Sequence, residues 1–490
     1  MIDATTALGV TAAVLVGFAL FGAWYARGRI NSVEDYISAR NSAGPGTLTA
    51  TIVASSMGSW ILFSPAEAGA AFGGLTAVVG YGLGSALALA AYAVVGPRIR
   101  TAIPEGHSLT EYAYARYGNA FYAFVLVVSL AYMFVFLAAE FTGIAGALSL
   151  IAGIPGWQTA ALVGVTVLAY TGYGGLRASM VTDTVQTLLI LPLLAITFAV
   201  TIVALGGTGS VYGSVASAAP NLLAPGYLPG LQFGVYVVVA ILGAEMLNQA
   251  WWQRVYAARD DATLRRSFLI AAVTVVPMIV LAGIFGLIAV GRGLVDGNAS
   301  VSFFLVVNDV LPAPAVLAVV VLAVLLVVSS ADTLFNAIAS VVTADLPRLV
   351  DLDDDSMTLA ARGLTGLVAL GATVVGAQGY SVLTLFLLAD LLAASVFVPL
   401  YHGLFSERAW TGGALVAGLA GLAVGVAFFP PARDALPAMG LPAASFLRSF
   451  VGAAAVSGGI AVGSARLAGR RFDLGRLDRE IRSLDAEGEP

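Results

Sequence analysis

The stretch from Pro314 to Thr343, PAVLAVVVLAVLLVVSSADTLFNAIASVVT, decides the fold because it begins as an apolar span and becomes polar halfway along. At ~1.5 Å per helical residue, Ser329 falls about 22 Å into a helix about 45 Å long, close to the middle of a bilayer. From there, oxygen-bearing side chains recur every three or four residues on one helix face: Ser329, Thr333, Asn336 and Ser340. Asp332 lies at the edge of this face, and a buried carboxylate in lipid is costly unless it is paired or faces water. The face is therefore expected to look onto other helices or an aqueous path, although hydroxyls that merely bond their own helix carbonyls are the alternative.

The composition indicates the class of protein. Hydrophobic residues make up 59% of the 490 residues, charged residues make up 10%, and the mean hydropathy is +0.93. Soluble proteins average about 45–50% and about 25%, so the chain is predicted to be an all-α polytopic membrane protein. It has no cysteine and two histidines, which excludes disulfides and iron–sulfur clusters and leaves too few histidines for a metal site. No motif supplies a nucleophile with a positioned base, so an enzyme is not expected.

Thirteen segments are apolar and long enough to be transmembrane helices. They are residues 6–26, 46–73, 76–97, 119–151, 158–174, 178–206, 231–256, 267–291, 314–343, 357–378, 380–402, 411–430 and 442–465. With the N-terminus outside, twenty of the 23 basic residues fall in or beside cytoplasmic loops or in the C-terminal tail. Because positive charge favours the cytoplasmic side, the N-terminus is predicted to be outside and the C-terminus inside a cell membrane that the chain crosses many times.

Two of these spans contain residues that interrupt membrane helices. The segment 46–73 contains Ser55, Gly58 and Pro65, and in the segment 231–256 Gly243 is the predicted start of an unwound part. Inverted-repeat transporters place their sites where two such broken helices meet. The two spans are five apart, which fits two inverted five-helix repeats. The predicted parts are an N-terminal helix and loop (1–45), the first repeat (46–206), an external loop (207–230), the second repeat (231–405), two further helices (406–468) and a cytoplasmic tail (469–490).

Five motifs in this order resemble the sodium:solute symporter family, whose members include the bacterial sodium/proline permease. They are VEDYISARNSAGP at 33–45, ASSMGSW at 54–60, YTGYGGLRASMVTDTVQ at 170–186, NQAWWQRVYAAR at 248–259 and SSADTLFNAIASVVTADL at 329–346. The resemblance runs nearly from end to end. It implies an inverted-repeat fold and transport by alternating access.

The resemblance also implies ion sites. Backbone carbonyls of the broken second span and a hydroxyl pair of the ninth would bind sodium: Ala54, Met57, Leu326, Ser329 and Ser330. All are oxygen donors, as a hard monovalent cation requires. Some members hold a second sodium, and the corresponding residues here are Asp183, Asp332 and Thr333. One of these is acidic where the family has a hydroxyl, so a second site is retained, altered or converted to a proton carrier. Sodium is the expected coupling ion, and no cofactor is expected.

The solute site implied by the resemblance lies between the broken helices and the fourth span. Its candidates are Trp60, Glu67, Glu140, Glu245, Asn248, Gln249, Trp251 and Trp252. For the tryptophans, packing is the alternative role. The three glutamates, and with them Asp390, are costly inside a membrane unless they serve a pathway or a partner.

The sequence therefore predicts a sodium-coupled symporter that imports a small polar organic solute, with proline or a similar amino acid or osmolyte as the best candidate. Its expected partners are the solute, sodium and the bilayer, without nucleic acid. Two alternatives within transport are proton coupling through the buried carboxylates and a solute of the urea, monocarboxylate or pantothenate type. From another class, a membrane solute sensor is the alternative, and the short tail speaks against a fused signalling kinase.

Overall fold

The computed structural model describes the chain except for residues 1, 28–38, 350–353, 434–439, 470 and 482–490. Part of the first motif, residues 33–38, therefore lies outside the described residues. The described chain is helical, and its only extended pairing is an isolated bridge between Ala43 and Ala258.

The helices follow one another along nearly the whole described chain. In chain order they are α1 (Ala4–Ala26), α3 (Pro45–Ser55), η1 (Ser59–Leu62), α4 (Ser64–Glu67), η2 (Ala68–Gly73), α5 (Gly74–Ala102), α6 (Leu109–Tyr117), α7 (Asn119–Ala152), α8 (Gly156–Ala204), α9 (Thr208–Ala218), η3 (Pro220–Leu223), α10 (Leu228–Leu247), α11 (Gln249–Ala257), α12 (Asp261–Gly291), η4 (Ala299–Val301), α13 (Ser302–Val310), α14 (Ala313–Leu349), α15 (Asp354–Gly376), α16 (Val382–Phe405), α17 (Thr411–Phe428), α18 (Pro430–Arg433), α19 (Phe446–Leu467) and α20 (Arg476–Glu480).

Ten helices of the described chain are long and apolar enough to cross a membrane. This confirms the predicted all-α polytopic class. Three shorter apolar helices accompany them: 156–169, 299–310 and 362–376. The predicted division between the fifth and sixth spans is present inside α8, where Gly175 has non-helical dihedral angles (φ 55°, ψ −168°). The exact number of thirteen spans and the orientation stay predictions.

The first predicted break lies between α3 and η1. The hydroxyl of Ser56, which ends α3, donates to the carbonyl of Val53 at 2.8 Å, and such a bond competes with continuation of the helix. Gly58 is extended (φ −95°, ψ −173°). Helix resumes at Ser64 with Pro65 in its first turn, where proline is tolerated. The break in this span is therefore confirmed.

The second break lies at Asn248 and not at Gly243, so its predicted position was wrong. α10 continues through Gly243 to Leu247, and the side chain of Asn248 caps α11 by accepting from the amide of Ala250 at 3.0 Å. Gly243 serves packing instead, because a Cβ there would lie 2.7 Å from the Cα of Ala394.

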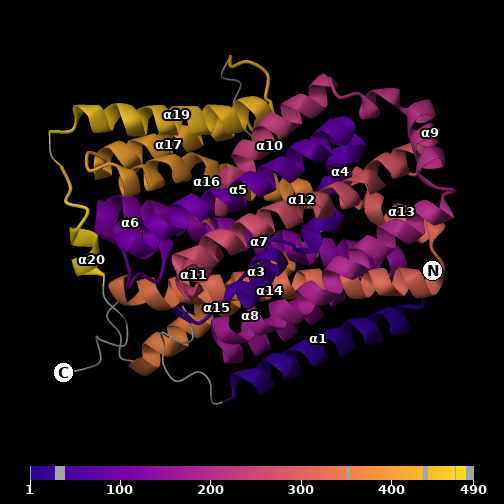
Figure 1. Ribbon diagram of the computed structural model, residues 1–490, viewed down its shortest axis with the longest axis horizontal. Coiled ribbons are helices and arrows are strands. Elements are labelled where there is room, and N and C mark those ends of the chain that lie inside the picture. The colour runs from indigo at the N-terminus through magenta and orange to yellow at the C-terminus, as the bar shows by residue number, and fades with distance from the viewer. Residues whose placement is uncertain (1, 28–38, 350–353, 434–439, 470, 482–490) are drawn as a thin grey trace.

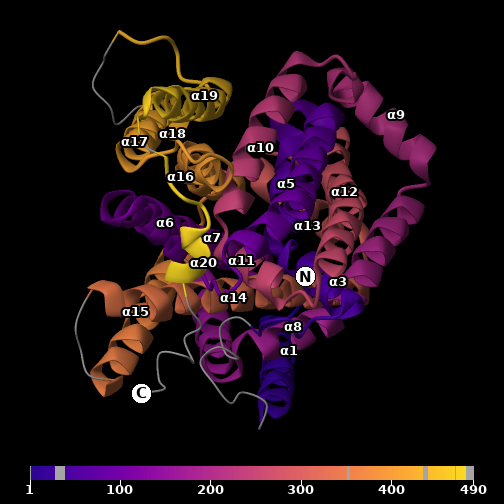
Figure 2. The same cartoon turned by 60° about the vertical axis from the view of Figure 1, so that its left-hand side comes forward.

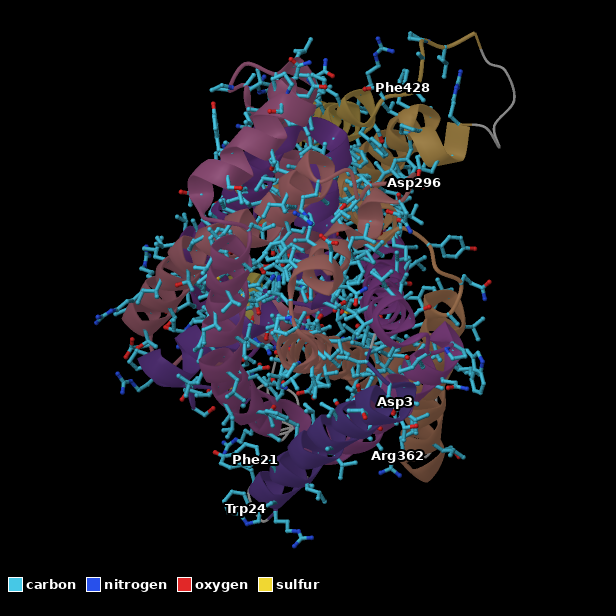
Figure 3. All side chains as sticks on the ribbon, turned by 90° about the vertical axis from the view of Figure 1, so that its right-hand side faces the viewer. Asp3, Phe21, Trp24, Asp296, Arg362 and Phe428 are labelled. Atoms are coloured by element: carbon cyan, nitrogen blue, oxygen red, sulfur yellow. The ribbon has the colours of Figure 1, made fainter. Side chains whose placement is uncertain are left out.

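The long helices run roughly side by side (Figure 1), with α6, α11 and α20 near one end of the molecule and α9 and α13 near the other. In the predicted topology the first three lie on the cytoplasmic side and the last two lie outside. Figure 2 shows α16, α17 and α19 together on one side and α1 on another. α1 contacts α8 and α14. Figure 3 shows Phe21 and Trp24 near the C-terminal end of α1, opposite Asp3, and Trp24 is 63% exposed, as expected for a lipid-facing helix.

Two further details concern the segment 207–230 and the helix α5. The uncharged segment 207–230, predicted as a loop, contains the helix α9 and the short turn η3. The glycine-rich element at 80–84 packs closely against α10, because a Cβ at Gly80 would lie 2.4 Å from the Cα of Gly234.

Candidate functional site

A polar cluster joins the break in α3 to the polar half of α14. The hydroxyls of Thr51 and Ser55 on α3 donate to Asp183 Oδ2 at 2.6 and 3.2 Å, and Ser329 on α14 donates to Asp183 Oδ1 at 2.6 Å. Ser55 also lies 3.0 Å from the hydroxyl of Thr333. Asp183, on α8, thus joins three helices within the buried interior.

Arg254, on α11, provides the counter-charge of this cluster. Its Nη2 lies 3.3 Å from Asp183 Oδ2 and contacts the hydroxyls of Ser55 and Thr333 at 2.8 and 3.0 Å. The side chains of Arg254 and Asp183 are both fully buried. Arg254 thus lies within α11 and faces the interior, although its position near the end of a predicted span suggested a loop-flanking residue.

Asp332 lies next to this cluster on α14. Thr171 donates to its Oδ1 at 2.8 Å and Asn336 Nδ2 donates to the same oxygen at 3.0 Å. Asp183 and Arg254 are both close enough to interact with it electrostatically. The three residues predicted for a second ion site, Asp183, Asp332 and Thr333, are therefore neighbours. An arginine that sequence analysis did not assign to the site lies among them.

The residues predicted for the main sodium site also lie at the contact between α3 and α14. The carbonyl of Ala54 accepts the amide of Met57 at 3.1 Å in the break itself. Ser329 and Ser330 follow Leu326 by about one turn of α14, and both serines are buried. Ser329 contacts Asp183 and Ser330 lies beside Glu140.

Glu140 on α7 holds the break in shape. Its Oε2 accepts the amide of Ser59 at 2.6 Å, and the Ser59 hydroxyl donates to the Glu140 carbonyl at 3.1 Å. A buried amide at a helix start needs an acceptor, so this carboxylate has a structural partner. Its predicted contact with solute stays a prediction.

At the second break, between α10 and α11, the free backbone carbonyls are bound by tyrosine side chains. The hydroxyl of Tyr92 donates to the carbonyl of Glu245 at 2.9 Å and that of Tyr401 to the carbonyl of Met246 at 2.8 Å. Tyrosines thus bind the carbonyls freed between α10 and α11. The Glu245 carboxylate accepts the indole N–H of Trp251.

Gln249 faces the start of α6 and the polar half of α14. Its Oε1 accepts the amide of Leu109 at 2.9 Å, and its Nε2 donates to the carbonyl of His107 at 2.8 Å and to Ser340 at 3.1 Å. Trp252 donates to the hydroxyl of Tyr401 at 2.8 Å and stacks on Tyr112. Both side chains link helices.

The remaining candidates, Trp60, Glu67 and Asp390, lie on or next to α16. Trp60 stacks on Tyr81 with ring centroids 5.6 Å apart and contacts Phe386 edge-on at 6.1 Å. Glu67 accepts the hydroxyl of Ser381, the N-cap of α16, at 3.1 Å through both carboxylate oxygens. Asp390 lies further along α16.

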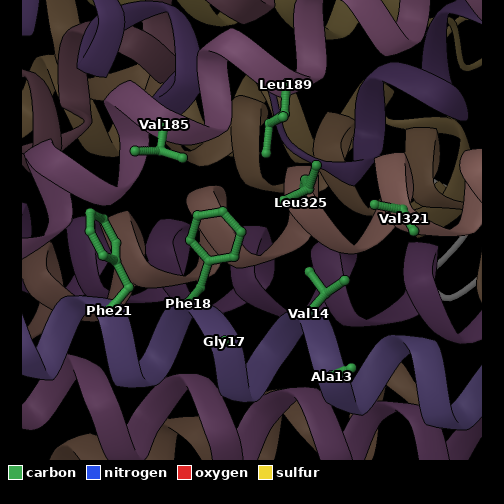
Figure 4. Close-up of a pocket in the computed structure, with 9 residues that line it drawn as sticks. All are labelled: Ala13, Val14, Gly17, Phe18, Phe21, Val185, Leu189, Val321 and Leu325. Carbon is green, nitrogen blue, oxygen red and sulfur yellow. The ribbon is translucent and has the colours of Figure 1, made fainter.

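A pocket of about 280 Å³ lies between α1, α8 and α14 (Figure 4). Its lining is apolar: Ala13, Val14, Gly17, Phe18, Phe21, Val185, Leu189, Val321 and Leu325. It lacks the polar groups that a hydrophilic solute requires, so it does not extend the polar site.

An ionic cluster at the end of the molecule that contains α6 connects α6 to α14. Arg348 contacts Glu111 Oε1 at 3.0 Å and Asp345 Oδ1 at 3.1 Å, and His107 Nδ1 lies 3.2 Å from Glu111 Oε2. Burial alone would raise the pKa of Glu111, but the hydrogen bonds and positive charges of His107 and Arg348 outweigh it and lower that pKa below 4.5.

Replacing Glu111 by Gln should lower the stability of the protein at pH 7 by about 1–3 kcal/mol, the contribution of hydrogen bonds to a charged group. Because the folded-state pKa is lowered, the stabilisation is fully present above pH 4.5 and is lost as the pH falls through the lowered value. Melting curves of wild type and variant should therefore differ at pH 7 and converge in acid. Glu407→Gln, at an exposed pair 3.9 Å from Arg471, is the control without effect. Equal melting temperatures for Glu111→Gln and wild type at pH 7 would contradict this assignment.

The comparisons with known proteins concern the chain as a whole. The model of the sodium:solute symporter family matches residues 36–421. The spermidine transporter DUR31 of Candida albicans is 27% identical over 423 residues, which cover 85% of this chain and 78% of that protein. The sodium/pantothenate symporter of Haemophilus influenzae is 30% identical over 257 residues, covering 48% of this chain and 51% of that protein.

Among solved structures, a sodium-coupled sialic acid symporter in a substrate-bound outward-open state has a TM-score of 0.76 at 17% identity, covering 95% of this chain and 98% of that one. Mhp1, a nucleobase-cation-symport-1 family transporter, has a TM-score of 0.56 at 14% identity, covering 92% and 100%. These likenesses show the fold.

Proposed function

The chain belongs to the sodium:solute symporter family, and from that premise we propose that it uses a sodium gradient to import a small polar organic solute by alternating access. One observation carries the sodium coupling. The break in α3 and the hydroxyls of α14 meet around Asp183, which bonds Thr51, Ser55 and Ser329. Oxygen donors from two helices at a helix break are what a hard monovalent cation requires.

The energetics of one sodium ion are sufficient for uphill import. A cation moving inward gains about 2.3 kcal/mol per 100 mV of membrane potential. A tenfold concentration gradient adds about 1.4 kcal/mol. Together these can concentrate a neutral solute several hundredfold.

The named relatives carry different solutes. Relatives are named as spermidine, urea and pantothenate transporters. The expectation of proline or a similar osmolyte from the sequence stays a prediction beside them. Proton coupling is the second candidate, favoured by the buried carboxylate Asp332, which has only neutral hydrogen-bond donors.

Replacing Ser329 and Ser330 together by Ala should raise the sodium concentration for half-maximal uptake by tenfold or more, about 1.4 kcal/mol of lost coordination. The measurement is uptake of labelled spermidine, urea, pantothenate and proline by proteoliposomes with an imposed sodium gradient. Ser395→Ala is the matched control, because its buried hydroxyl bonds only the carbonyl of Leu392, at 2.7 Å. Equal uptake by the wild type in sodium and choline media, or uptake driven by a pH gradient alone, would refute sodium coupling.

A further inference from the structure

Three carboxylates near the break of α10 and the start of α16 lack a cationic partner. In the described part of the chain, Asp390 has no hydrogen bond or ion pair and is 6% exposed. Glu245 accepts the indole N–H of Trp251 and Glu67 accepts the hydroxyl of Ser381. Their further partners, Asn248 for Glu245 and Ser300 and the backbone of Leu383 for Glu67, are neutral as well. This differs from the polar cluster around Asp183, where Arg254 supplies the counter-charge. Uncompensated carboxylates inside a membrane protein are costly and mark a ligand or ion pathway.

The three carboxylates lie within electrostatic range of one tyrosine. Tyr81, on α5, is close enough to Asp390, Glu245 and Glu67 to interact electrostatically with each of them. Asp390 and Glu245 also interact with each other. Glu245 keeps part of its surface accessible although it lies in the interior of the bundle. The carboxylates therefore belong to one internal region.

Two of the carboxylates, Glu67 through Ser381 and Asp390 directly, mark two positions along α16. Ser381, which holds Glu67, caps the start of this helix, and Asp390 lies in its third turn. At ~1.5 Å per residue, these two positions are about 13 Å apart. Ligand atoms lie about 2.0–2.6 Å from a bound small cation, so one such cation does not reach both positions.

Aromatic rings lie between the position of Glu67 and that of Asp390. Phe386 lies one turn before Asp390 on the same face of α16, and Trp60 contacts it edge-on. Trp60 in turn stacks on Tyr81. Aromatic faces accept both methylene chains and ammonium groups.

We propose that the solute is an elongated aliphatic amine with at least two ammonium groups. Asp390 and Glu245 bind one end, Glu67 binds the other, and the chain between them packs against Trp60, Tyr81 and Phe386. This proposal rests on the symporter function proposed above. A zwitterion such as proline brings a carboxylate of its own into this acidic region, and urea supplies no cation to pair with the three carboxyl groups.

The first test is equilibrium binding of labelled spermidine to the purified full-length protein. The proposal expects saturable binding, competition that strengthens from butylamine to 1,4-diaminobutane and 1,8-diaminooctane, and none by proline or urea. Asp390→Asn should weaken spermidine binding about tenfold to a hundredfold, the effect of losing a hydrogen bond to a charged group. Glu67→Gln should weaken 1,8-diaminooctane and leave butylamine unchanged. Asp309→Asn, at a partly exposed ion pair with Arg292, is the matched control.

The second test separates this proposal from sodium coupling. Proteoliposomes with wild type, Asp390→Asn and Asp309→Asn are assayed for spermidine, proline and pantothenate uptake across a range of sodium concentrations. The proposal expects Asp390→Asn to raise the spermidine concentration for half-maximal uptake without changing that for sodium. Sodium-driven uptake of proline or pantothenate with no amine binding overturns the amine proposal and leaves the symporter intact. Amine binding that Asp390→Asn abolishes, with uptake indifferent to sodium, supports the amine proposal and overturns sodium coupling.

Discussion

Arg254→Met should destabilise the protein by about 3–5 kcal/mol and abolish solute uptake, because it leaves the buried carboxylate of Asp183 without its counter-charge. The guanidinium also contacts Ser55 on α3 and Thr333 on α14. Its loss therefore weakens the contact between α3 and α14 as well as the charge balance. Melting temperature and uptake by the reconstituted variant measure the two effects separately.

The matched control for this substitution is Arg259→Met. Arg259 lies on the same segment and pairs with Asp260 at 3.3 Å, but both side chains are exposed, so its loss should cost about 0–1 kcal/mol. The double variant Arg254→Met with Asp183→Asn should recover much of the stability, since neither charge is then left alone, and should not recover transport. A stable, active Arg254→Met single variant would show that the pair is neither a structural nor a functional requirement.

The position of Arg254 could not be predicted from the sequence by counting charges. Basic residues near span ends are usually cytoplasmic anchors, and the motif NQAWWQRVYAAR ends at a predicted cytoplasmic loop. The break at Asn248 starts a new short helix, α11, and this helix turns Arg254 into the interior. A signal was present, because Glu245, Asn248 and Gln249 already made the segment too polar for an ordinary span.

The two breaks differ in how well the sequence located them. In α3, the residues of ASSMGSW include Gly58 and three serines, which offer the backbone alternatives to a helix, and the break lies there. In α10, the break was predicted at Gly243 because glycine favours unwinding. The structure shows instead that the backbone of Ala394 packs closely against Gly243 and that the helix continues past it. The break instead follows the capping side chain of Asn248 and the tyrosines that bind the freed carbonyls. Those partners come from α5 and α16, which a local pattern does not reveal.

The neighbourhoods of the candidate residues were also only partly predictable. Helical spacing brought Ser329 and Thr333 to one face of α14, and they share a cluster with Asp183. The separation of the acids into a balanced group around Arg254 and an unbalanced group around Tyr81 depends on how α5, α10 and α16 pack. Tyr81 and Phe386 were missed because isolated aromatic residues in apolar spans look like ordinary core residues.

Gly58→Ala should lower both the stability of the protein and its sodium activation, because the break after α3 has no room for a side chain at this position. A Cβ at Gly58 would lie 2.0 Å from Glu140 Oε1 and 2.5 Å from its Cδ. Glu140 would have to move and give up the amide of Ser59, which it accepts at 2.6 Å. Overpacking of this kind costs about 1–3 kcal/mol. Since Met57 precedes Gly58 directly, the sodium concentration for half-maximal uptake should rise together with the loss of melting temperature.

Gly46→Ala is the control for Gly58→Ala, because Gly46 lies on the same broken span and a Cβ there meets nothing within 4 Å. Glu140→Gln separates the two contributions of the contact. Its amide oxygen can still accept from Ser59, so the shape of the break and the sodium response should be largely kept if geometry is what matters. If Glu140→Gln instead weakens sodium activation as much as Gly58→Ala while the melting temperature stays unchanged, the negative charge of Glu140 acts on the ion directly. Sodium activation unchanged in Gly58→Ala would mean that the carbonyls of this break do not bind the coupling ion.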